Sequence, residues 1–415
     1  MRILTPADPG FDQARRPWNL AVDQPVQAVA EAADAADVAA ALAYARANGL
    51  AVTAQPSGHG ASGDVDGVLL LRTAGLDELE IRPDERIARV GAGIQWGQVL
   101  AAAGEHGLIG LAGSSPVVSV TGYTLGGGLS WFSRKHGNAC DAVRAFDVVT
   151  ADGAEARITA DSDPDLFWAL RGGGGDFALV TAIEFELFPA PHLFGGRMLW
   201  SGDRTPEVLA AFQEITADAP EELTLWLELL HFPGAPPMVA IDATYLGEEA
   251  AARALLRPLD GIPGLISDSR ARMRIADLGT ITAEPTDPSP GVSRGELLSR
   301  LDAEALLSAP IAPLLSVQIR HLGGALARPS DSAAGPIAEP YALYMFGIPS
   351  AGDIAARQRE MADALGDAVT GRKPYNFLAP HEPAALAFAP DTLDRLRKLK
   401  EGREIIRANH PVVSK

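Results

Sequence analysis

The stretch Gln55-Pro56-Ser57-Gly58-His59-Gly60-Ala61-Ser62-Gly63 decides how the rest of this chain is interpreted. It follows a predicted strand, Ala51–Ala54, and holds one imidazole among glycines and small polar residues. Glycine reaches left-handed backbone angles and lets the backbone lie close to a ligand. The composition favours a rigid cradle that presents His59 to a flat or phosphorylated ligand. A tight surface turn with an exposed histidine is the alternative.

The residues before this stretch predict a β-α-β unit. Gln27–Glu31 is typical of a short strand, and Asp34–Asn48 carries apolar residues at helical spacing before a helix stop at Asn48-Gly49. Ala51–Ala54 is then the second strand, with His59 just beyond its carboxyl end. Open α/β sheets bind ligands at such ends, which favours the cradle.

The composition excludes several classes of function. The 415 residues carry a formal net charge of −18, whereas nucleic-acid partners require clustered Lys and Arg. A single cysteine, Cys140, excludes an intrachain disulfide framework and a cysteine-based metal cluster. No apolar signal core or bilayer-spanning stretch is evident, so we expect a cytoplasmic protein with no membrane partner.

A change in composition near residue 195 predicts a second domain with its own α+β layer, extending to about residue 370. Its predicted strands are Val239–Tyr245, Leu314–His321 and Tyr341–Phe346, and its predicted helices are Glu248–Leu256, Arg294–Leu307 and Ala355–Leu365.

Two further glycine-rich stretches could bind a ligand. Leu111–Trp131 is low in charge, and its serial small residues can cradle a pyrophosphate with backbone N–H groups and hydroxyls. A glycine-lined packing loop is the alternative there. Gly172–Gly175 is either a ligand-facing turn or, as we favour, the end of a helix. The chain has no metal-binding motif and no nucleophile elbow, so we expect no metal site.

Taken together and in this order, these stretches resemble the FAD-linked oxidases of the vanillyl-alcohol-oxidase/PCMH superfamily, and within it the bacterial berberine-bridge-enzyme-like branch. The matching segments are Arg16-Pro17-Trp18-Asn19, Ser57-Gly58-His59-Gly60-Ala61, Gly113-Ser114-Ser115-Pro116, Gly122-Tyr123-Thr124-Leu125-Gly126-Gly127-Gly128, Asp165-Leu166-Phe167-Trp168-Ala169-Leu170-Arg171-Gly172-Gly173-Gly174, Arg320-His321-Leu322-Gly323-Gly324-Ala325-Leu326 and Asn409-His410-Pro411-Val412.

The resemblance implies an α+β fold. A PCMH-type FAD-binding domain of two α+β subdomains would occupy residues 1–192. A substrate-binding α+β domain with an antiparallel sheet would occupy residues 193–370 and cover the isoalloxazine. Residues 371–415 would return to the FAD-binding domain.

The resemblance also implies the cofactor, FAD, and its contacts. His59 matches the family histidine that bonds covalently to a flavin ring methyl, while Ser115 stands where doubly linked members have a cysteine. Only a histidyl link is therefore expected. Asp176 replaces a family asparagine and is expected to face away from the phosphates. The expected FAD-binding residues are Ser57, Gly58, His59, Gly60, Ala61, Gly113, Ser114, Ser115, Gly122, Gly126, Gly127, Gly128, Leu179 and Asn376.

The implied activity is transfer of a hydride from a small organic substrate, of the natural-product kind, to the flavin, with dioxygen as the acceptor that reoxidises it. Tyr375 and His321 are the residues predicted to act as catalytic base, although Tyr375 stands one position away from the family tyrosine. Tyr341 and Tyr344, on predicted strands of the second domain, are further candidates. Ordinary packing in the sheet is the alternative for His321 and for these two tyrosines. The alternative function is a flavin-fold cyclase or binding scaffold without net redox turnover.

Overall fold

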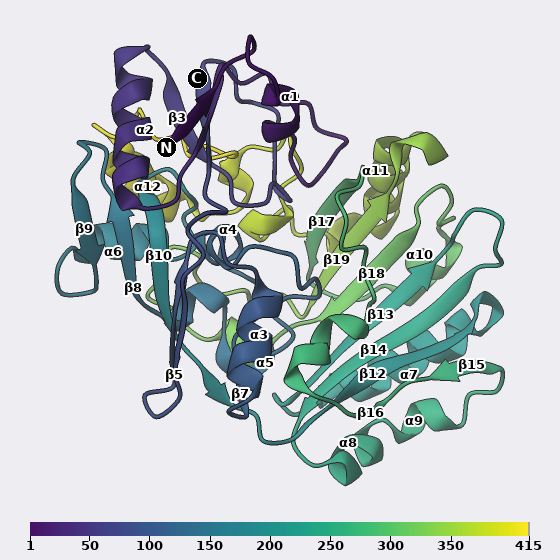
Figure 1. The fold of residues 1–415 in the computed structure, drawn as a ribbon. Helices are drawn as coiled ribbons and strands as arrows, with labels where there is room; N and C mark the ends of the chain where they lie inside the picture. The colour runs from purple at the N-terminus through teal and green to yellow at the C-terminus, as the bar shows by residue number, and fades with distance from the viewer. Residues whose placement is uncertain (414–415) are drawn as a thin grey trace.

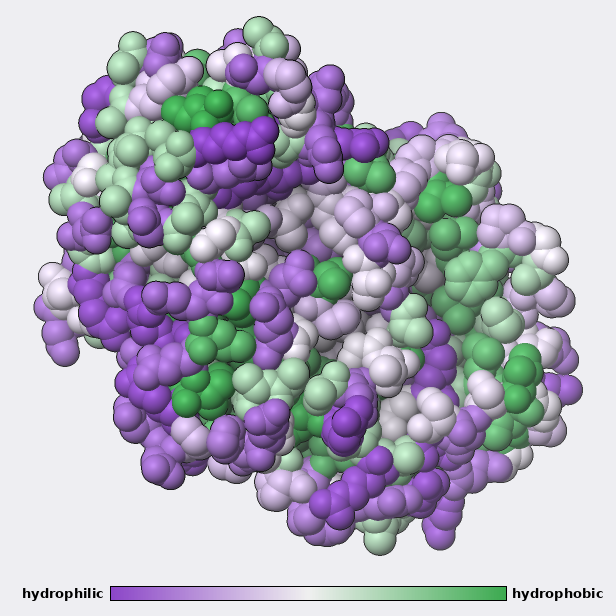
Figure 2. All heavy atoms as spheres, viewed as in Figure 1, coloured by the Kyte–Doolittle hydropathy of each residue, from purple (hydrophilic) through white to green (hydrophobic). Residues whose placement is uncertain are grey.

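The computed structural model describes residues 1–413, and Figure 1 shows an α+β chain with two lobes, which Figure 2 draws in full from the same side. The N-terminal lobe contains β1–β11, and the large-sheet lobe contains β12–β19. The N-terminus and the last described residues of the chain lie in the N-terminal lobe, where Ile406 forms a bridge with Val52 of β3. The chain thus leaves this lobe once and returns to it.

The first sheet of the N-terminal lobe forms the predicted β-α-β unit. Its strand order is β1 (Arg2–Leu4), β2 (Ala28–Glu31), β4 (Val68–Arg72) and β3 (Ala51–Ala54), of which the last three are parallel. Helix α2 (Ala35–Ala47) connects β2 and β3, and the Asp34 carboxylate caps it by accepting a hydrogen bond from the Asp37 N–H. Strand β3 has the predicted bounds, and α2 lies within the predicted Asp34–Asn48.

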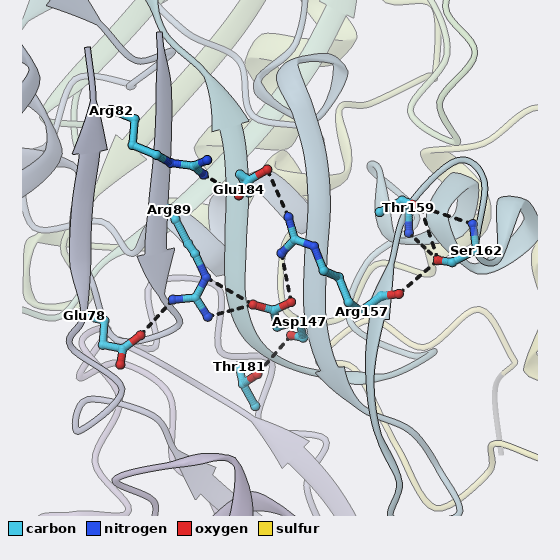
Figure 3. Close-up of polar contacts among 9 residues, drawn as sticks. All are labelled: Glu78, Arg82, Arg89, Asp147, Arg157, Thr159, Ser162, Thr181 and Glu184. Carbon is cyan, nitrogen blue, oxygen red and sulfur yellow. Dashed lines mark hydrogen bonds and ion pairs between the residues drawn. The ribbon is translucent and has the colours of Figure 1, made fainter. Parts of the chain in front are cut away.

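The second sheet of this lobe is antiparallel. Its strands are β5 (Leu79–Arg82), β6 (Ile87–Gly91), β10 (Leu179–Glu186), β8 (Val143–Val149) and β9 (Glu155–Ile158). Helix α2 packs between the two sheets, because its apolar side chains share one core with Val52 of β3, Val149 of β8 and Leu179 of β10. The face of the second sheet that points away from its main core carries the ladder of arginines and carboxylates in Figure 3.

The remaining elements of the N-terminal lobe are short. They are β7 (Leu108–Ile109), β11 (Phe188–Pro189), α1 (Phe11–Ala14), α3 (Trp96–Gly104), α4 (Val120–Leu125), α5 (Ser133–His136), η1 (Ala139–Ala142), α6 (Pro164–Leu170) and, from the end of the chain, α12 (Pro390–Lys400), which contacts α6.

The large-sheet lobe is built on one antiparallel sheet. Its strand order is β15 (Leu265–Asp268), β12 (Leu193–Ser201), β14 (Met238–Leu246), β13 (Leu223–Leu230), β18 (Ser316–His321), β19 (Tyr341–Gly347) and β17 (Val292–Leu298), with β16 (Ala271–Arg272) also paired to β12. Its helices are α7 (Thr205–Ala217), α8 (Glu249–Leu255), α9 (Arg257–Asp260), α10 (Ala303–Ser308) and α11 (Ile354–Leu365).

The helices cover one face of this sheet, and alternate residues of each strand therefore have different surroundings. Leu225, Leu227 and Leu229 of β13 belong to the core beneath the helices. The residues between them, Trp226 and Glu228, face the N-terminal lobe, and Trp226 stacks on Trp131 with ring centroids 3.6 Å apart. The uncovered face of the sheet is thus turned towards the glycine-rich loops.

One predicted element is wrong. Arg294–Leu307 was expected to be helical, but its first residues belong to β17 and only Ala303–Ser308 is helix. Strand β17 pairs along its whole length with β19, and Phe377 lies so close over Gly295 that an added Cβ would be 2.6 Å from it. Pairing and packing with distant residues have overridden the local helical preference.

Candidate FAD and substrate site

His59 lies in a protected position beyond β3. Its ring stacks on Trp18 with centroids 4.2 Å apart, and its Nδ1 is 2.8 Å from the Ser57 Oγ. Burial lowers the pKa of His59 to about 4, so the ring is neutral at physiological pH. Its Nε2 is buried and has no partner within residues 1–413. A neutral imidazole with an unpartnered nitrogen is suited to form a bond to a ligand.

The N-terminal arm holds this loop in place. The N–H groups of Trp18 and Asn19 donate to the carbonyl oxygens of Ser57 and Gly58. Gly58 has φ +93°, and an added Cβ would be 2.8 Å from Pro17. Only glycine allows this close approach at this backbone angle. The segment Arg16–Asn19, one of those that resemble the family, therefore supports the loop that carries His59.

The second glycine-rich stretch contains buried polar groups that lack partners. The hydroxyls of Ser115, Ser119, Thr121 and Thr124 are all buried, and within the described part of the chain none of their oxygens has a hydrogen-bond partner. Buried hydroxyls are normally hydrogen-bonded, so such a cluster is suited to bind a polar ligand. The residues present fit a group rich in hydrogen-bonding oxygens, as FAD is.

Asn376 joins this stretch from near the end of the chain. It lies in η7 (Tyr375–Phe377), and its Nδ2 donates to the carbonyl oxygen of Tyr123 at 2.8 Å. A Cβ on Gly126 would be 1.8 Å from the Asn376 Oδ1. The structure thus brings together Asn376, Gly126 and α4, three parts of the predicted FAD site.

Most of the other predicted FAD-binding residues belong to the same two glycine-rich loops. Ala61 is buried, Gly60 is exposed, and Gly128 packs against the Tyr123 ring. Leu179 lies apart at the start of β10, opposite Val149, in the core between the two sheets. Its contact with the cofactor stays a prediction.

Gly172–Gly175 ends a helix, as we favoured. Helix α6 stops at Leu170, and the Gly173 N–H donates to the carbonyl oxygen of Ala169. Positive φ angles at Gly172 and Gly174 let the chain pass close to Ala334 and Tyr375. The Asp176 carboxylate faces the end of the chain, where it accepts hydrogen bonds from the N–H groups of Ala408 and Val412.

Neither residue predicted as catalytic base is placed for that role. The Tyr375 hydroxyl donates to the carbonyl oxygen of His410 at 2.7 Å, and burial raises its pKa well above the ordinary value. His321 lies beside Tyr341 on the helix-covered face of the sheet. Its Nε2 is 2.8 Å from the Arg134 guanidinium, and burial together with this cation lowers its pKa to about 3. The geometry therefore argues against both roles.

Three charged residues that were not predicted lie on the uncovered face of the sheet. Arg197 of β12 binds Asp242 of β14 through both carboxylate oxygens, at 2.6 and 2.7 Å, and binds the Glu228 Oε2 of β13 at 2.8 Å. Glu228 is 3% exposed and Asp242 is fully buried. Burial and the neighbouring charge of Asp242 raise the pKa of Glu228 to about 8. Its Oε1 has no partner in the described residues, so Glu228 is well suited to exchange a proton with a ligand.

One signal in the sequence could have identified this group. Glu228 and Asp242 are each the one charged residue of a largely apolar strand, in Leu223–Leu230 and Met238–Leu246. An acidic residue in the middle of such a strand is rare without a partner. The partner, Arg197, becomes evident only when the three strands are paired.

Within residues 1–413 no helix is long and apolar enough to cross a membrane. The same residues contain no group of three or more His, Cys, Asp or Glu side chains that could hold a metal ion.

Comparisons with known proteins agree with this geometry. Residues 26–159 match a family model described as an FAD binding domain. (R)-6-Hydroxynicotine oxidase of Paenarthrobacter nicotinovorans is 29% identical over 300 residues, which cover 70% of this chain and 65% of that protein. The sequence match thus spans just under two thirds of this relative.

Solved structures share the fold over the whole chain. A crystal structure of 6-hydroxy-D-nicotine oxidase from Arthrobacter nicotinovorans superposes with a TM-score of 0.84 at 22% identity, covering 100% of this chain and 97% of that one. Glucooligosaccharide oxidase from Acremonium strictum, whose flavin is described as 6-S-cysteinyl, 8α-N1-histidyl FAD, has a TM-score of 0.83 at 20% identity, with coverages of 99% and 96%.

Proposed function

We propose that this chain, a member of the vanillyl-alcohol-oxidase/PCMH superfamily by its FAD-binding domain and its fold, is an FAD-dependent oxidoreductase that oxidises a small organic molecule. The observation that carries the proposal is the arrangement of two groups of polar atoms. Unpartnered hydroxyls and His59 line the glycine-rich loops, and a buried carboxylate with an unpartnered oxygen lies on the sheet that faces them.

His59 is the proposed tether of the flavin. Its neutral ring, fixed by Trp18 and Ser57, offers an unpartnered nitrogen. Ser115 cannot supply the thioether that a cysteine would form, so His59 would carry the only covalent link. Gly126–Gly128 and Asn376 would lie against the ring system, and the hydroxyls near α4 would bind its polar groups.

When bound, FAD accepts a hydride from the substrate. The chain must remove the proton that is lost with it, and Glu228 is the residue we propose for that step. A base works best when its pKa lies near the working pH, and burial beside Asp242 brings Glu228 to that range. Arg197 fixes the Oε2 of Glu228 and leaves the Oε1 free to accept the proton.

We also propose dioxygen as the electron acceptor and a natural product as the substrate. The relatives support both parts of this proposal by their names, which include a hydroxynicotine oxidase and a chitooligosaccharide oxidase. The proposed domains are 1–192, 193–370 and 371–415. They agree with the start of β12 at Leu193 and with the contact between α12 and α6.

Anaerobic mixing with a panel of alcohols, amines and sugars tests the proposal. We expect at least one class to bleach the flavin absorption band, and readmission of air to restore it with release of peroxide. A protein that takes up no FAD would contradict the proposal. A flavoprotein that no compound in the panel bleaches would favour a cyclase or a scaffold instead.

A further inference from the structure

Arg320 is a buried cation on the uncovered face of the large sheet. It lies on β18, beside Trp226 of β13, and is 7% exposed. Its guanidinium carbon is 4.0 Å from the centroid of the Trp226 ring, 5.2 Å from that of Tyr344 and 5.3 Å from that of Phe377. Three aromatic rings therefore surround this cation and fix its position.

The hydrogen bonds of Arg320 leave part of it free. Its Nε and Nη2 both donate to the Gln318 Oε1, at 3.1 and 2.8 Å. Within residues 1–413 no group accepts a hydrogen bond from its Nη1, and no carboxylate forms an ion pair with it. Arginine normally enters a protein interior only with an anionic partner. In this respect Arg320 differs from Arg197, which lies on the same face and binds two carboxylates.

The other charges on this face leave Arg320 without a neutralising contact. Arg197 binds both Asp242 and Glu228, so these two carboxylates are engaged by Arg197, and neither forms an ion pair with Arg320. Glu284 acts on Arg320 only through longer-range electrostatics, and it lies on a partly exposed loop. Among the described residues, Arg320 is therefore a buried cation on this face that forms no ion pair, unlike Arg197.

We infer that Arg320 binds an anionic oxygen of the substrate, a carboxylate or a phenolate, carried on a planar or aromatic group that packs beside Trp226 and Tyr344. The guanidinium fork and the flat rings suit such a group better than a neutral sugar. This inference rests on the proposed function for the place of the substrate. It adds the charge of that substrate and the residue that selects it.

Benzoate is a suitable probe, and benzamide is its neutral counterpart of the same shape. Titration of the flavin-loaded protein in a calorimeter measures binding of each without any turnover, so the result does not depend on the proposed oxidation. We expect benzoate to bind at least about tenfold more tightly than benzamide. Absence of benzoate binding, or equal affinities for the two compounds, would overturn the inference.

Variants assign the effect to Arg320. Arg320→Gln is expected to weaken benzoate binding at least about tenfold and to leave benzamide binding unchanged. Arg320→Lys, which keeps the charge without the fork, should bind benzoate with intermediate affinity. It also serves as the test if the glutamine variant does not fold. Glu284→Gln should leave benzoate binding unchanged or tighten it, because it removes a nearby negative charge.

Arg328→Gln is the matched control, because Arg328 is exposed and pairs with Glu221 at the surface. It is expected to bind benzoate as the unaltered protein does. If Arg320→Gln shifts the reduction potential of the flavin but leaves benzoate affinity unchanged, Arg320 acts on the cofactor and the inference is wrong.

Discussion

At the scale of single residues, Glu228 is the group whose chemistry depends most on its surroundings. A carboxylate at the surface has a pKa near 4.3, whereas Glu228 has one of about 8. The difference arises from burial and from the charge of Asp242, only partly offset by Arg197. If Glu228, Asp242 and Arg197 were exposed to solvent, all three would stay charged and none could exchange a proton near neutral pH.

If Glu228 is the base, kcat/KM should rise with pH and level off above an apparent pKa near 8, because only the deprotonated carboxylate accepts a proton. Glu228→Gln should lower kcat/KM about 100-fold or more and remove that rise. A pH series of initial rates measures both effects. Glu214→Gln, on the exposed side of α7, is the control and should change neither. An unaltered pH profile in Glu228→Gln would rule out the assignment.

Tyr375 offers a contrasting prediction. Tyr375→Phe removes one partly buried hydrogen bond, to the His410 carbonyl, and should cost about 0.5–1.5 kcal/mol of unfolding free energy. The pH profile of kcat/KM should stay the same, since the hydroxyl has a structural role. A fall in kcat/KM of about 100-fold or more, without loss of stability, would restore Tyr375 as the base.

At the scale of elements, α4 and η7 meet although about 250 residues separate them. Their contact is the hydrogen bond from Asn376 to the carbonyl oxygen of Tyr123, and it is possible because Gly126 has no side chain. The end of α4 is thus shaped by the C-terminal segment of the chain.

Gly126→Ala tests this contact. The new methyl group would overlap the Asn376 amide, so η7 must move, and we expect the purified variant to retain less FAD per chain than the unaltered protein. Absorbance at the flavin band relative to that at 280 nm measures this ratio. Gly261→Ala, where an added Cβ meets nothing within 4 Å, should retain FAD fully. Equal flavin content in both variants would count against a cofactor beside Gly126.

Local sequence signals identified the elements that local interactions determine. Strand β3 and helix α2 were predicted well, since apolar periodicity and the Asp34 cap define them. Strand β17 was not, because its conformation depends on β19 and on Phe377. The acidic pair on the large sheet was missed for the same reason, as its meaning depends on the pairing of β12, β13 and β14. The proposed tether, His59, was identified by a motif that holds all its parts within a few residues.

At the scale of the whole molecule, one guanidinium joins the two lobes. Arg134 of α5 donates to the carbonyl oxygens of Ala219, Leu223 and Leu322 in the large-sheet lobe and contacts the His321 ring. The stacked pair Trp131 and Trp226 makes a second contact across the same boundary. The junction is therefore both polar and aromatic, and it requires a neutral His321.

Stability should depend on pH at this junction. The pKa of His321 is lowered to about 3 in the folded protein, against about 6.5 when unfolded, so below pH 6.5 the unfolded chain binds a proton that the folded chain does not. His136, whose pKa is lowered to about 4, acts in the same direction.

The melting temperature should therefore fall between pH 6.5 and pH 4. His321→Gln should show a shallower fall, because the amide can contact Arg134 without titrating. Thermal unfolding followed by circular dichroism at several pH values measures this. A fall of the same slope in both proteins would show that His321 does not contribute.

The central claim, that this fold holds FAD through His59, is tested most directly by the mass of the denatured protein. We predict that the intact chain, precipitated with acid and washed, stays yellow and carries the added mass of one FAD. The His59→Ala protein should release its flavin into the supernatant and show the mass of the bare chain. Flavin that washes out of the unaltered protein, or that stays attached to the variant, would contradict the account.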